Sequence, residues 1–439
     1  MRLALKDRLI NIIFILFPLS FILGNFAVNL NIVLFISFFL FDLARDKNKF
    51  YEENKTYFFI SLIFIAYLLF NTLISNYFES ENIIKAIFYI RFFLLFIAIK
   101  YYIEKDVIKL DLTFKYWSIL LTIVFVDLLF EIINGKNLLG YSANIPGRLA
   151  SFFKDELIVG FFLSSFGLIL ISNLISRNLK YAFLLLLLIF AVLITGERTS
   201  FIRLFLTLFF VFIFIDNINI NKKKLLTISI SFFILFVGII NFSNISYFEN
   251  IKKRYGIRYV EKDNWYSIGG LDFRSKPNIC KAESCKGEVF DTTSNFYYKT
   301  HYGKYYLISK HILAENLFFG TGNKTFRVAC KDYKKVLENI YKLTDPGCTT
   351  HPHQIYYELI SEHGLIGTFI ILILLFYLLF IPMKKMSLRK DIFKLIIFFY
   401  LISYFIPIIP SGSFFSTVNS FIYWFFYGFY TSKKSNMTN

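Results

Sequence analysis

The sequence predicts an all-α polytopic membrane protein, with about twelve transmembrane helices and one large extramembrane loop that carries short helices. Three observations predict this class. Of the 439 residues, 56% are hydrophobic and 58 are phenylalanine, far above the composition of a soluble domain. Apolar stretches long enough to cross a hydrocarbon core of about 30 Å recur along the chain. Lysine and arginine gather in alternate short loops between these stretches, as the positive-inside rule expects.

The apolar runs divide the chain into three parts. Residues 1–242 contain the first nine predicted transmembrane helices, residues 243–362 form the loop, and residues 363–439 contain the last three helices and a tail. Within the loop, apolar residues at three- and four-residue spacing predict helices over 303–316 and 331–343, whereas 244–300 lacks a clear period and predicts irregular structure. The predicted spans are 9–24, 26–43, 56–76, 83–103, 116–134, 156–175, 179–195, 200–216, 224–242, 363–382, 392–409 and 411–430.

The formal net charge of +18 reflects topology rather than nucleic-acid binding. Basic residues cluster in short loops of one side, whereas the opposite short loops hold few of them. The sequence has no basic stripe interleaved with aromatic residues on a soluble domain. We therefore expect no nucleic-acid partner, both termini on the cytoplasmic side, and the 243–362 loop on the outer side.

All four cysteines, Cys280, Cys285, Cys330 and Cys348, lie in the predicted outer loop. An even number confined to the non-cytoplasmic side predicts two disulfides. Three pairings are possible, and the simplest joins Cys280 to Cys285 and Cys330 to Cys348. A zinc site that includes the nearby histidines is the alternative, but the spacings match no standard structural zinc pattern.

The densest cluster of reactive residues is the stretch 348–367, which contains His351, His353 and His363. Pro352 restricts the residue before it to extended geometry and can open a helix as its first residue. Apolar residues at helical spacing follow, and Gly364 is expected to end or bend that helix before the next apolar run. A histidine pair therefore stands at the start of a short helix just outside a membrane span, where chemistry on a lipid-linked substrate is plausible.

Two motifs in this part of the chain resemble the bacterial O-antigen ligase and polymerase superfamily, which are membrane glycosyltransferases of GT-C type. His353-Gln354, followed after nine residues by Gly364-x-x-Gly367, is similar to the histidine motif of that superfamily. The stretch 316–326, which contains Gly320-Thr-Gly322, is similar to its upstream Pro-Leu-Phe-Gly-x-Gly segment, with Asn316 near the usual proline.

The resemblance implies transfer of a glycan from an undecaprenyl-pyrophosphate donor to a hydroxyl of a lipid A core sugar, at the periplasmic face of the bacterial inner membrane. His353 would be the general base, because an imidazole with a reference pKa of about 6.5 accepts a proton at neutral pH. The structural alternative is that His353 caps or packs its helix. No cofactor and no metal are expected.

Pyrophosphate requires guanidinium groups or a metal. Arg198 stands at the outer end of a predicted span and resembles an arginine of the superfamily; the alternative is an interfacial arginine that snorkels. Arg203 lies one turn further on, where it shares this role or pairs with Glu197. Arg148 is a second outer arginine.

Two further positions leave questions open. Where the superfamily has another arginine, this chain has His301-Tyr-Gly-Lys304, so His301, Lys304 or the more distant Arg274 would supply the positive charge. Arg91 lies inside a predicted span, where a buried charge costs about 2.5–3.5 kcal/mol or more, so it should face the bundle interior and have a partner.

Two other functions remain as alternatives. An O-antigen polymerase, which joins lipid-linked repeat units, shares these motifs. A non-enzymatic transporter of polyprenyl lipids or solutes would place ionisable groups at the membrane midplane within broken, repeated helices. The polar residues of this chain concentrate instead in the outer loop.

Overall fold

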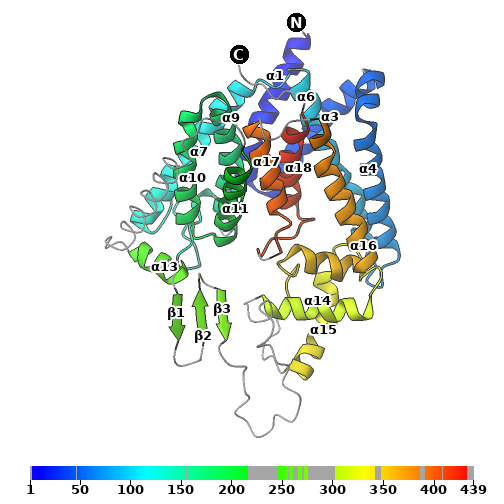
Figure 1. Cartoon of the computed structure of the whole chain (residues 1–439), viewed down its shortest axis with the longest axis vertical. Helices are drawn as coiled ribbons and strands as arrows, with labels where there is room; N and C mark the ends of the chain where they lie inside the picture. The colour runs from blue at the N-terminus through cyan, green and yellow to red at the C-terminus, as the bar shows by residue number, and fades with distance from the viewer. Residues whose placement is uncertain are drawn as a thin grey trace.

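The protein is a bundle of helices with polar elements at one end. The computed structural model describes residues 2–45, 47–154, 156–215, 246–255, 257–260, 265–268, 271–274, 302–341, 348–385, 391–407 and 409–432. Helix α1 begins and α18 ends at one end of the bundle, whereas α13, the sheet, α14 and α15 lie at the other end (Figure 1). We refer to this second end as the polar end.

The helices of the first half of the chain follow the predicted spans. Residues 9–24 correspond to α1 and α2, residues 83–103 to α5 and α6, and residues 156–175 to α8 and α9 joined by a short π-helix. The elements are α1 (Arg2–Ile15), α2 (Phe17–Leu23), α3 (Asn25–Arg45), α4 (Lys47–Leu73), α5 (Ser80–Phe88), α6 (Ile90–Glu104), α7 (Leu110–Asn134), η1 (Ser151–Phe153), α8 (Val159–Phe162), η2 (Leu163–Gly167), α9 (Leu168–Arg177), η3 (Leu179–Ala182), α10 (Phe183–Ile194) and α11 (Arg198–Phe214).

The second half of the described chain begins with the polar elements and ends with three apolar helices, α16, α17 and α18. The predicted loop helices are present as α14 and α15. The prediction of irregular structure over 244–300 was incomplete, because its described parts include a helix and a small antiparallel sheet of order β1-β2-β3. The elements are α13 (Ser246–Tyr255), β1 (Ile257–Val260), β2 (Trp265–Ile268), β3 (Leu271–Arg274), α14 (Gly303–Glu315), α15 (Phe326–Tyr341), α16 (Ile355–Phe380), η6 (Pro382–Lys385), α17 (Ile392–Ser403) and α18 (Thr417–Thr431).

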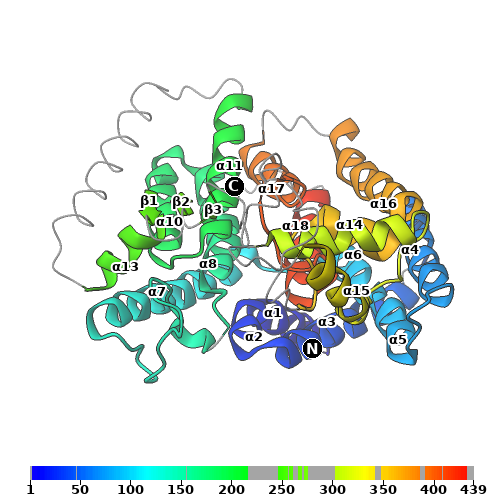
Figure 2. The same ribbon diagram turned by 90° about the horizontal axis from the view of Figure 1, so that it is seen from below.

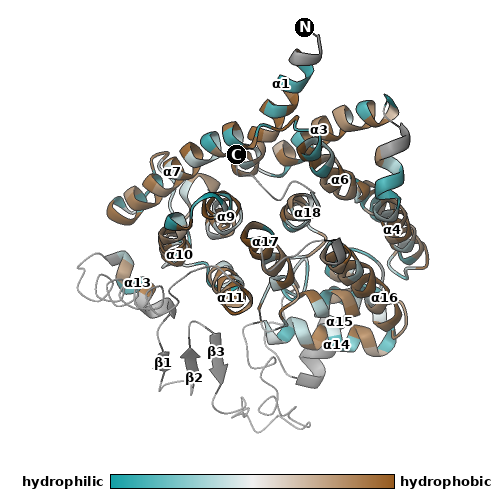
Figure 3. Cartoon of the chain, turned by 45° about the horizontal axis from the view of Figure 1, so that its top comes forward, coloured by the Kyte–Doolittle hydropathy of each residue, from teal (hydrophilic) through white to brown (hydrophobic). Residues whose placement is uncertain are grey.

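Six helical segments of the described chain are long and apolar enough to cross a membrane: 25–45, 50–73, 80–104, 110–134, 159–177 and 355–380. Helices such as α7, α11 and α16 are hydrophobic along most of their length (Figure 3). Large apolar side chains on their outer faces are exposed, as expected for contact with lipid, and Phe205 and Phe369 are examples. A predominantly helical membrane fold is therefore confirmed. The count of twelve spans stays a prediction, and the ninth span, 224–242, lies outside the described residues.

The interior of the bundle is built around α18, which packs along α6 and α17. Figure 2 shows α18 between two groups of helices, with α7, α10 and α11 on one side and α4, α5 and α16 on the other. Aromatic rings fill this interior, and the centroids of Phe93 and Trp424 are 4.5 Å apart. Gly428 allows the close approach, because a Cβ there would lie 2.8 Å from Cβ of Ile99.

Candidate active site

His353 lies just before α16 at the polar end, among other aromatic rings. Its ring centroid is 4.2 Å from that of His351, 4.8 Å from Tyr302 and 5.7 Å from Tyr305. Its φ of 58° is in the left-handed region, which histidine tolerates better than most residues, and its carbonyl accepts a 2.9 Å hydrogen bond from the Ser411 amide. Backbone outliers of this kind cost on the order of 1–3 kcal/mol and cluster at functional sites.

Gln354, the second residue of the motif, starts the helix. Its side-chain Oε1 accepts a 2.9 Å hydrogen bond from the Tyr357 amide, which makes it the N-cap of α16. Its Nε2 donates to the Pro407 carbonyl at 3.2 Å. The helix thus begins at Ile355, and Pro352 lies in the segment before it rather than in the first helical turn.

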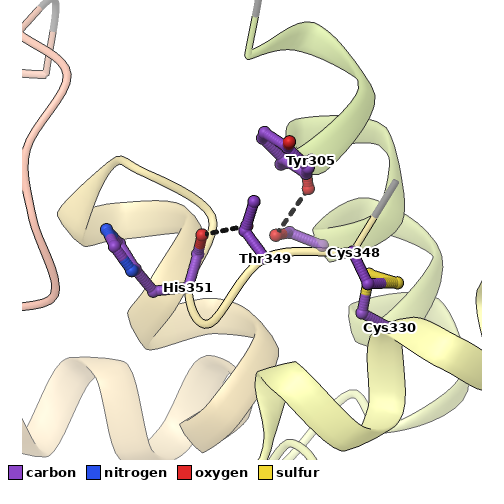
Figure 4. The surroundings of a disulfide bond; sticks show 6 residues. Tyr305, Cys330, Cys348, Thr349 and His351 are labelled. Atoms are coloured by element: carbon purple, nitrogen blue, oxygen red, sulfur yellow. Dashed lines mark hydrogen bonds between the residues drawn. A yellow bond between two sulfur atoms is a disulfide. The ribbon is translucent and has the colours of Figure 1, made fainter. Parts of the chain in front are cut away.

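A disulfide between Cys330 and Cys348 ties the histidine segment to α15 (Figure 4). In the same segment the Thr349 hydroxyl donates to the His351 carbonyl at 2.7 Å. The chain on the N-terminal side of the two histidines is therefore held by a covalent link and a local turn, while Gln354 holds it on the other side. Cys280 and Cys285 lie outside the described residues, so their pairing stays a prediction.

The two motifs, although far apart in sequence, are joined backbone to backbone. Gly364 has φ 64° and ψ −167°, so it interrupts α16 as the sequence predicts, and the chain on both sides of it pairs with the 316–326 segment. These bonds run from Thr321 N to Ser361 O (3.0 Å), Gly322 N to Glu362 O (2.8 Å), Leu365 N to Leu317 O (2.8 Å) and Ile366 N to Phe318 O (3.0 Å). We call this pairing the motif junction.

The glycines of both motifs are needed for close packing at this junction. A Cβ on Gly320 would lie 2.4 Å from the Glu362 carbonyl carbon, and one on Gly364 would lie 2.4 Å from that of Phe318. A Cβ on Gly322 would meet Ser75 Oγ at 2.4 Å, and one on Gly367 would meet Tyr67 Oη at 1.7 Å. Gly320 and Gly364 therefore allow another backbone segment to approach, whereas Gly367 allows the approach of Tyr67 of α4 and Gly322 that of Ser75, which follows α4.

Helix α4 and Ser75, which follows it, support the junction with polar side chains that sequence reasoning missed. Asn71 Nδ2 donates to the Phe319 carbonyl at 2.7 Å, and the Ser75 hydroxyl donates to the Thr321 carbonyl. Asn71 is fully buried within a candidate membrane span. Burial of a polar residue in such a span costs free energy, so such residues usually have a functional or structural role. The presence of Asn71 in an apolar stretch could therefore have indicated its role from the sequence.

A buried charge cluster lies beneath the junction, and it was also missed. Glu362 accepts hydrogen bonds from the amides of Lys324 (2.9 Å) and Phe326 (3.2 Å). Glu358, one turn earlier, accepts from the Ser413 hydroxyl, to which Lys324 Nζ donates at 3.1 Å. Burial lowers the pKa of Lys324, and the charges of Glu358 and Glu362 oppose that shift. The signal was two carboxylates four residues apart on a helix that enters the membrane.

A cleft of about 520 Å³ opens beside this cluster at the polar end. Four of its lining residues are cations, namely Lys85 of α5, Arg91 of α6, Lys324 and Arg327. None of its lining residues is acidic, and its remaining wall includes His351 and the apolar side chains of α5 and α6. Burial, together with the charges of Lys324 and His353, lowers the pKa of His351 to about 3, so its imidazole is neutral at neutral pH. We call this the cationic cleft.

The predicted arginines form a separate group around the turn between α10 and α11. The Arg148 guanidinium donates to the Leu157 carbonyl and interacts with Glu197. Burial raises the pKa of Glu197, and the charge of Arg148 opposes the rise. Arg198 is the first residue of α11, and Arg203 lies one turn further along it.

Arg203 is almost fully buried, and its described contacts are with aromatic rings rather than with Glu197. Its guanidinium carbon lies 4.0 Å from the ring centroid of Tyr404 and 5.6 Å from that of Phe161. Tyr404 begins the segment 404–416 that connects α17 to α18. In this same segment the Ser411 amide donates to the His353 carbonyl, and the Pro407 carbonyl accepts from Gln354 Nε2. The arginine group and the histidine group therefore meet the connecting segment from different sets of helices, and the described contacts do not join them directly.

Two other predicted residues can be placed, and one cannot. Arg91, expected to need a partner, donates to Asn29 Oδ1 at 3.2 Å and to the Phe88 carbonyl at 2.6 Å. Lys304 lies on α14, with its ammonium 5.2 Å from the ring centroid of Tyr305. His301 lies outside the described residues. Within the described ranges, no group of three or more histidine, cysteine, aspartate or glutamate side chains is arranged to hold a metal ion.

The fold and the site together define a class: a multi-span helical membrane protein whose reactive polar groups gather at the end of the bundle opposite its termini. Residues 183–372 match the family model described as O-antigen ligase. This match confirms the resemblance predicted from the sequence and places that segment in the O-antigen ligase and polymerase superfamily. The segment runs from α10 into α16 and contains both motifs, Arg198 and Arg203. No curated protein matches the chain.

The family match implies a membrane glycosyltransferase of ligase or polymerase type that acts on lipid-linked glycans. Arg148, together with Lys85 and Arg91 of the cationic cleft, lies before the matched residues.

Proposed function

We propose that this protein is an O-antigen ligase that transfers a glycan from an undecaprenyl-pyrophosphate carrier to a hydroxyl of a lipid A core sugar at the periplasmic face. The bond between the anomeric carbon of the glycan and the pyrophosphate oxygen breaks. Undecaprenyl pyrophosphate is the leaving group, and its oxygen keeps the electron pair of that bond. The acceptor oxygen forms the new glycosidic bond as its proton passes to His353. The transfer is metal-independent.

The observation that carries the proposal is the construction around His353. The disulfide, the Gln354 cap and the bond from Ser411 hold this residue in a left-handed conformation at the polar end, next to the motif junction. An imidazole held in this way is suited to receive a proton. Because His351 is neutral, its ring does not oppose the positive charge that His353 gains on accepting that proton.

We assign the donor pyrophosphate to the arginine group of Arg148, Arg198 and Arg203, with His301 as a further contributor. Guanidinium groups match phosphate oxygens in bidentate geometry and keep their charge when partly buried. The Nε atoms of Arg148 and Arg203 are buried and have no hydrogen-bond partner in the described part of the chain, which supports a ligand at this place. The pyrophosphate is thus stabilised as negative charge develops on the leaving oxygen.

The test is transfer by the purified full chain in nanodiscs, from a polyprenyl-pyrophosphate-linked glycan to a lipid A core acceptor. His353→Asn is the sharpest variant, because asparagine also adopts the left-handed conformation but provides no base. We expect transfer to fall by about 10²–10⁴-fold, with a melting temperature close to wild type. Arg198→Gln should raise the KM for the donor.

The matched control is Arg177→Gln, which removes an arginine at the opposite end of the bundle, where it pairs with Asp111 on the surface. This variant should transfer at the wild-type rate. Undiminished transfer by His353→Asn would remove the base from the mechanism. If the wild type uses a lipid-linked repeat as acceptor but not the lipid A core, the protein is a polymerase.

A further inference from the structure

The cationic cleft is a second site of concentrated positive charge, separate from the arginine group. It is lined by α5, α6, the segment 323–327 and residues 412–419, whereas the arginine group lies around α8 and α11, where Arg203 contacts Tyr404 at the start of the connecting segment. Figure 2 shows α5 and α6 apart from α8 and α11, with α17 and α18 between them. A single pyrophosphate therefore does not account for both cationic groups.

Three of the four cations, Lys85, Arg91 and Arg327, are available to a ligand, whereas Lys324 belongs to the buried cluster with Glu358 and Glu362. Lys85 pairs with Glu81 at 3.2 Å, and Arg327 pairs with Glu79 at 3.6 Å, but all four side chains are at least one-third exposed. Surface pairs of this kind contribute only about 0–1 kcal/mol, so a phosphate can displace them. The described hydrogen bonds of Arg91 go to neutral acceptors, an amide oxygen and a carbonyl, which leave its charge uncompensated.

Two buried polar atoms in the lining point to an absent ligand independently of charge. Asn323 Oδ1 and His351 Nε2 are inaccessible and have no hydrogen-bond partner among the described residues. Buried polar groups in proteins nearly always have a partner, so an orphaned pair in one cleft indicates a bound group or water. Hydroxyl or amide groups of a sugar are suitable partners for each of these atoms.

The cleft also has an apolar wall whose outer side chains are exposed. Ile84 and Phe88 of α5 line it and are 54% and 59% exposed. Phe92 and Phe415 continue this wall inward. A ligand with a charged head and a hydrocarbon anchor fits such a surface better than a free anion does.

From these observations we propose that the cationic cleft binds the lipid-borne phosphate of the glycan acceptor. His351 lines the cleft, and its ring lies 4.2 Å from that of His353, so a sugar attached to that phosphate reaches the base. The inference rests on the proposed function and adds the place where the acceptor binds. The two sites would then present donor and acceptor from different sets of helices. Lys85 and Arg91 lie outside the residues matched by the family model.

The experiment compares a double variant, Lys85→Gln with Arg327→Gln, with the wild type and with Arg198→Gln. Lys310→Gln is the matched control, because Lys310 is an exposed lysine of α14 that does not line the cleft. Binding is measured without turnover, in neutral phosphatidylcholine nanodiscs, with polyprenyl phosphate, the uncharged polyprenol and inorganic pyrophosphate as probes. Transfer is measured separately as KM for donor and for acceptor.

We expect the double variant to lose one class of polyprenyl-phosphate sites and to raise the acceptor KM by about 10–100-fold, with the donor KM unchanged. Arg198→Gln should show the converse, and Lys310→Gln should behave as wild type. Inorganic pyrophosphate that binds the cleft as tightly as polyprenyl phosphate would contradict a lipid-borne ligand. A double variant with unchanged acceptor KM and unchanged binding would overturn the cleft assignment while leaving the glycosyltransferase intact. Binding to the cleft without any transfer by the wild type would instead reject the proposed function alone.

Discussion

Replacing Gly364 with alanine tests whether the motif junction holds the site together. At this residue φ is 64° and ψ is −167°, a conformation that is essentially restricted to glycine. The added Cβ would lie 2.4 Å from the Phe318 carbonyl carbon and 2.5 Å from its oxygen. These are backbone atoms, so no side chain can rotate away, and the two segments must separate.

The expected loss of stability follows from these two terms. Forcing alanine into this backbone conformation costs about 1–3 kcal/mol. Separation of the segments weakens the bonds from Leu365 N to Leu317 O and from Ile366 N to Phe318 O, which contribute about 0.5–1.5 kcal/mol each. Together the substitution should reduce the free energy of unfolding by about 2–6 kcal/mol.

Gly135→Ala is the matched control. Gly135 also has a positive φ, of 72°, but a Cβ there would meet nothing within 4 Å. The free energy of unfolding of Gly135→Ala should fall only by the cost of holding alanine in a left-handed backbone conformation, about 1–2 kcal/mol. Denaturant titration of both variants in the same detergent gives the difference, and the transfer assay should show activity lost only in Gly364→Ala. Equal destabilisation of the two variants would refute the close approach at the junction.

Three further predictions concern the surroundings of the site. Loss of the disulfide should reduce the free energy of unfolding by about 3 kcal/mol in Cys330→Ser, in Cys348→Ser and in the double variant alike, because each opens the same loop of 18 residues. Unequal losses in denaturant titration would contradict this. Glu362→Gln should reduce the free energy of unfolding by about 1–3 kcal/mol, because the glutamine amide cannot accept from both the Lys324 and Phe326 backbone amides. The control Glu52→Gln, at an exposed residue, should change it by less than about 0.5 kcal/mol. The pKa of His351 is about 3 in the folded protein and about 6.5 when unfolded, so its contribution to stability is complete above pH 6.5 and is lost as pH falls toward 3. Melting temperature against pH should fall less steeply in His351→Gln, and parallel curves would count against a buried neutral imidazole.

The sequence allowed prediction of the helices and of the two motifs, because both are local. Each predicted span except 224–242 coincides with a described helix or helix pair, since long apolar runs in a membrane have few alternatives to helix. The bend at Gly364 was predicted from one glycine between a polar and an apolar stretch. The family resemblance required only the order of His353, Gly364 and the Gly320 segment.

The contacts that complete the site depend on pairing between distant segments, which a single sequence does not reveal. Lys324 was visible only as a residue inside a motif, and nothing in its neighbourhood indicated that Glu358 and Glu362 lie against it. The cationic cleft combines Lys85 with Arg327, which are separated by most of the chain. The three short strands within 257–274 were missed because each has only four residues, too few for an alternating pattern to be distinguished.

The link between Cys330 and Cys348 has a consequence for biogenesis. A disulfide forms and persists in an oxidising compartment, so, with the loop on the outer side as we propose, the histidine segment would acquire its anchor only after the loop has left the reducing cytoplasm. The hydrophobic helices can insert and pack before that moment, whereas the reactive end matures last. Export would thus act as an activation step, and a newly made chain would stay inert toward carrier lipids until oxidation of its thiols had taken place.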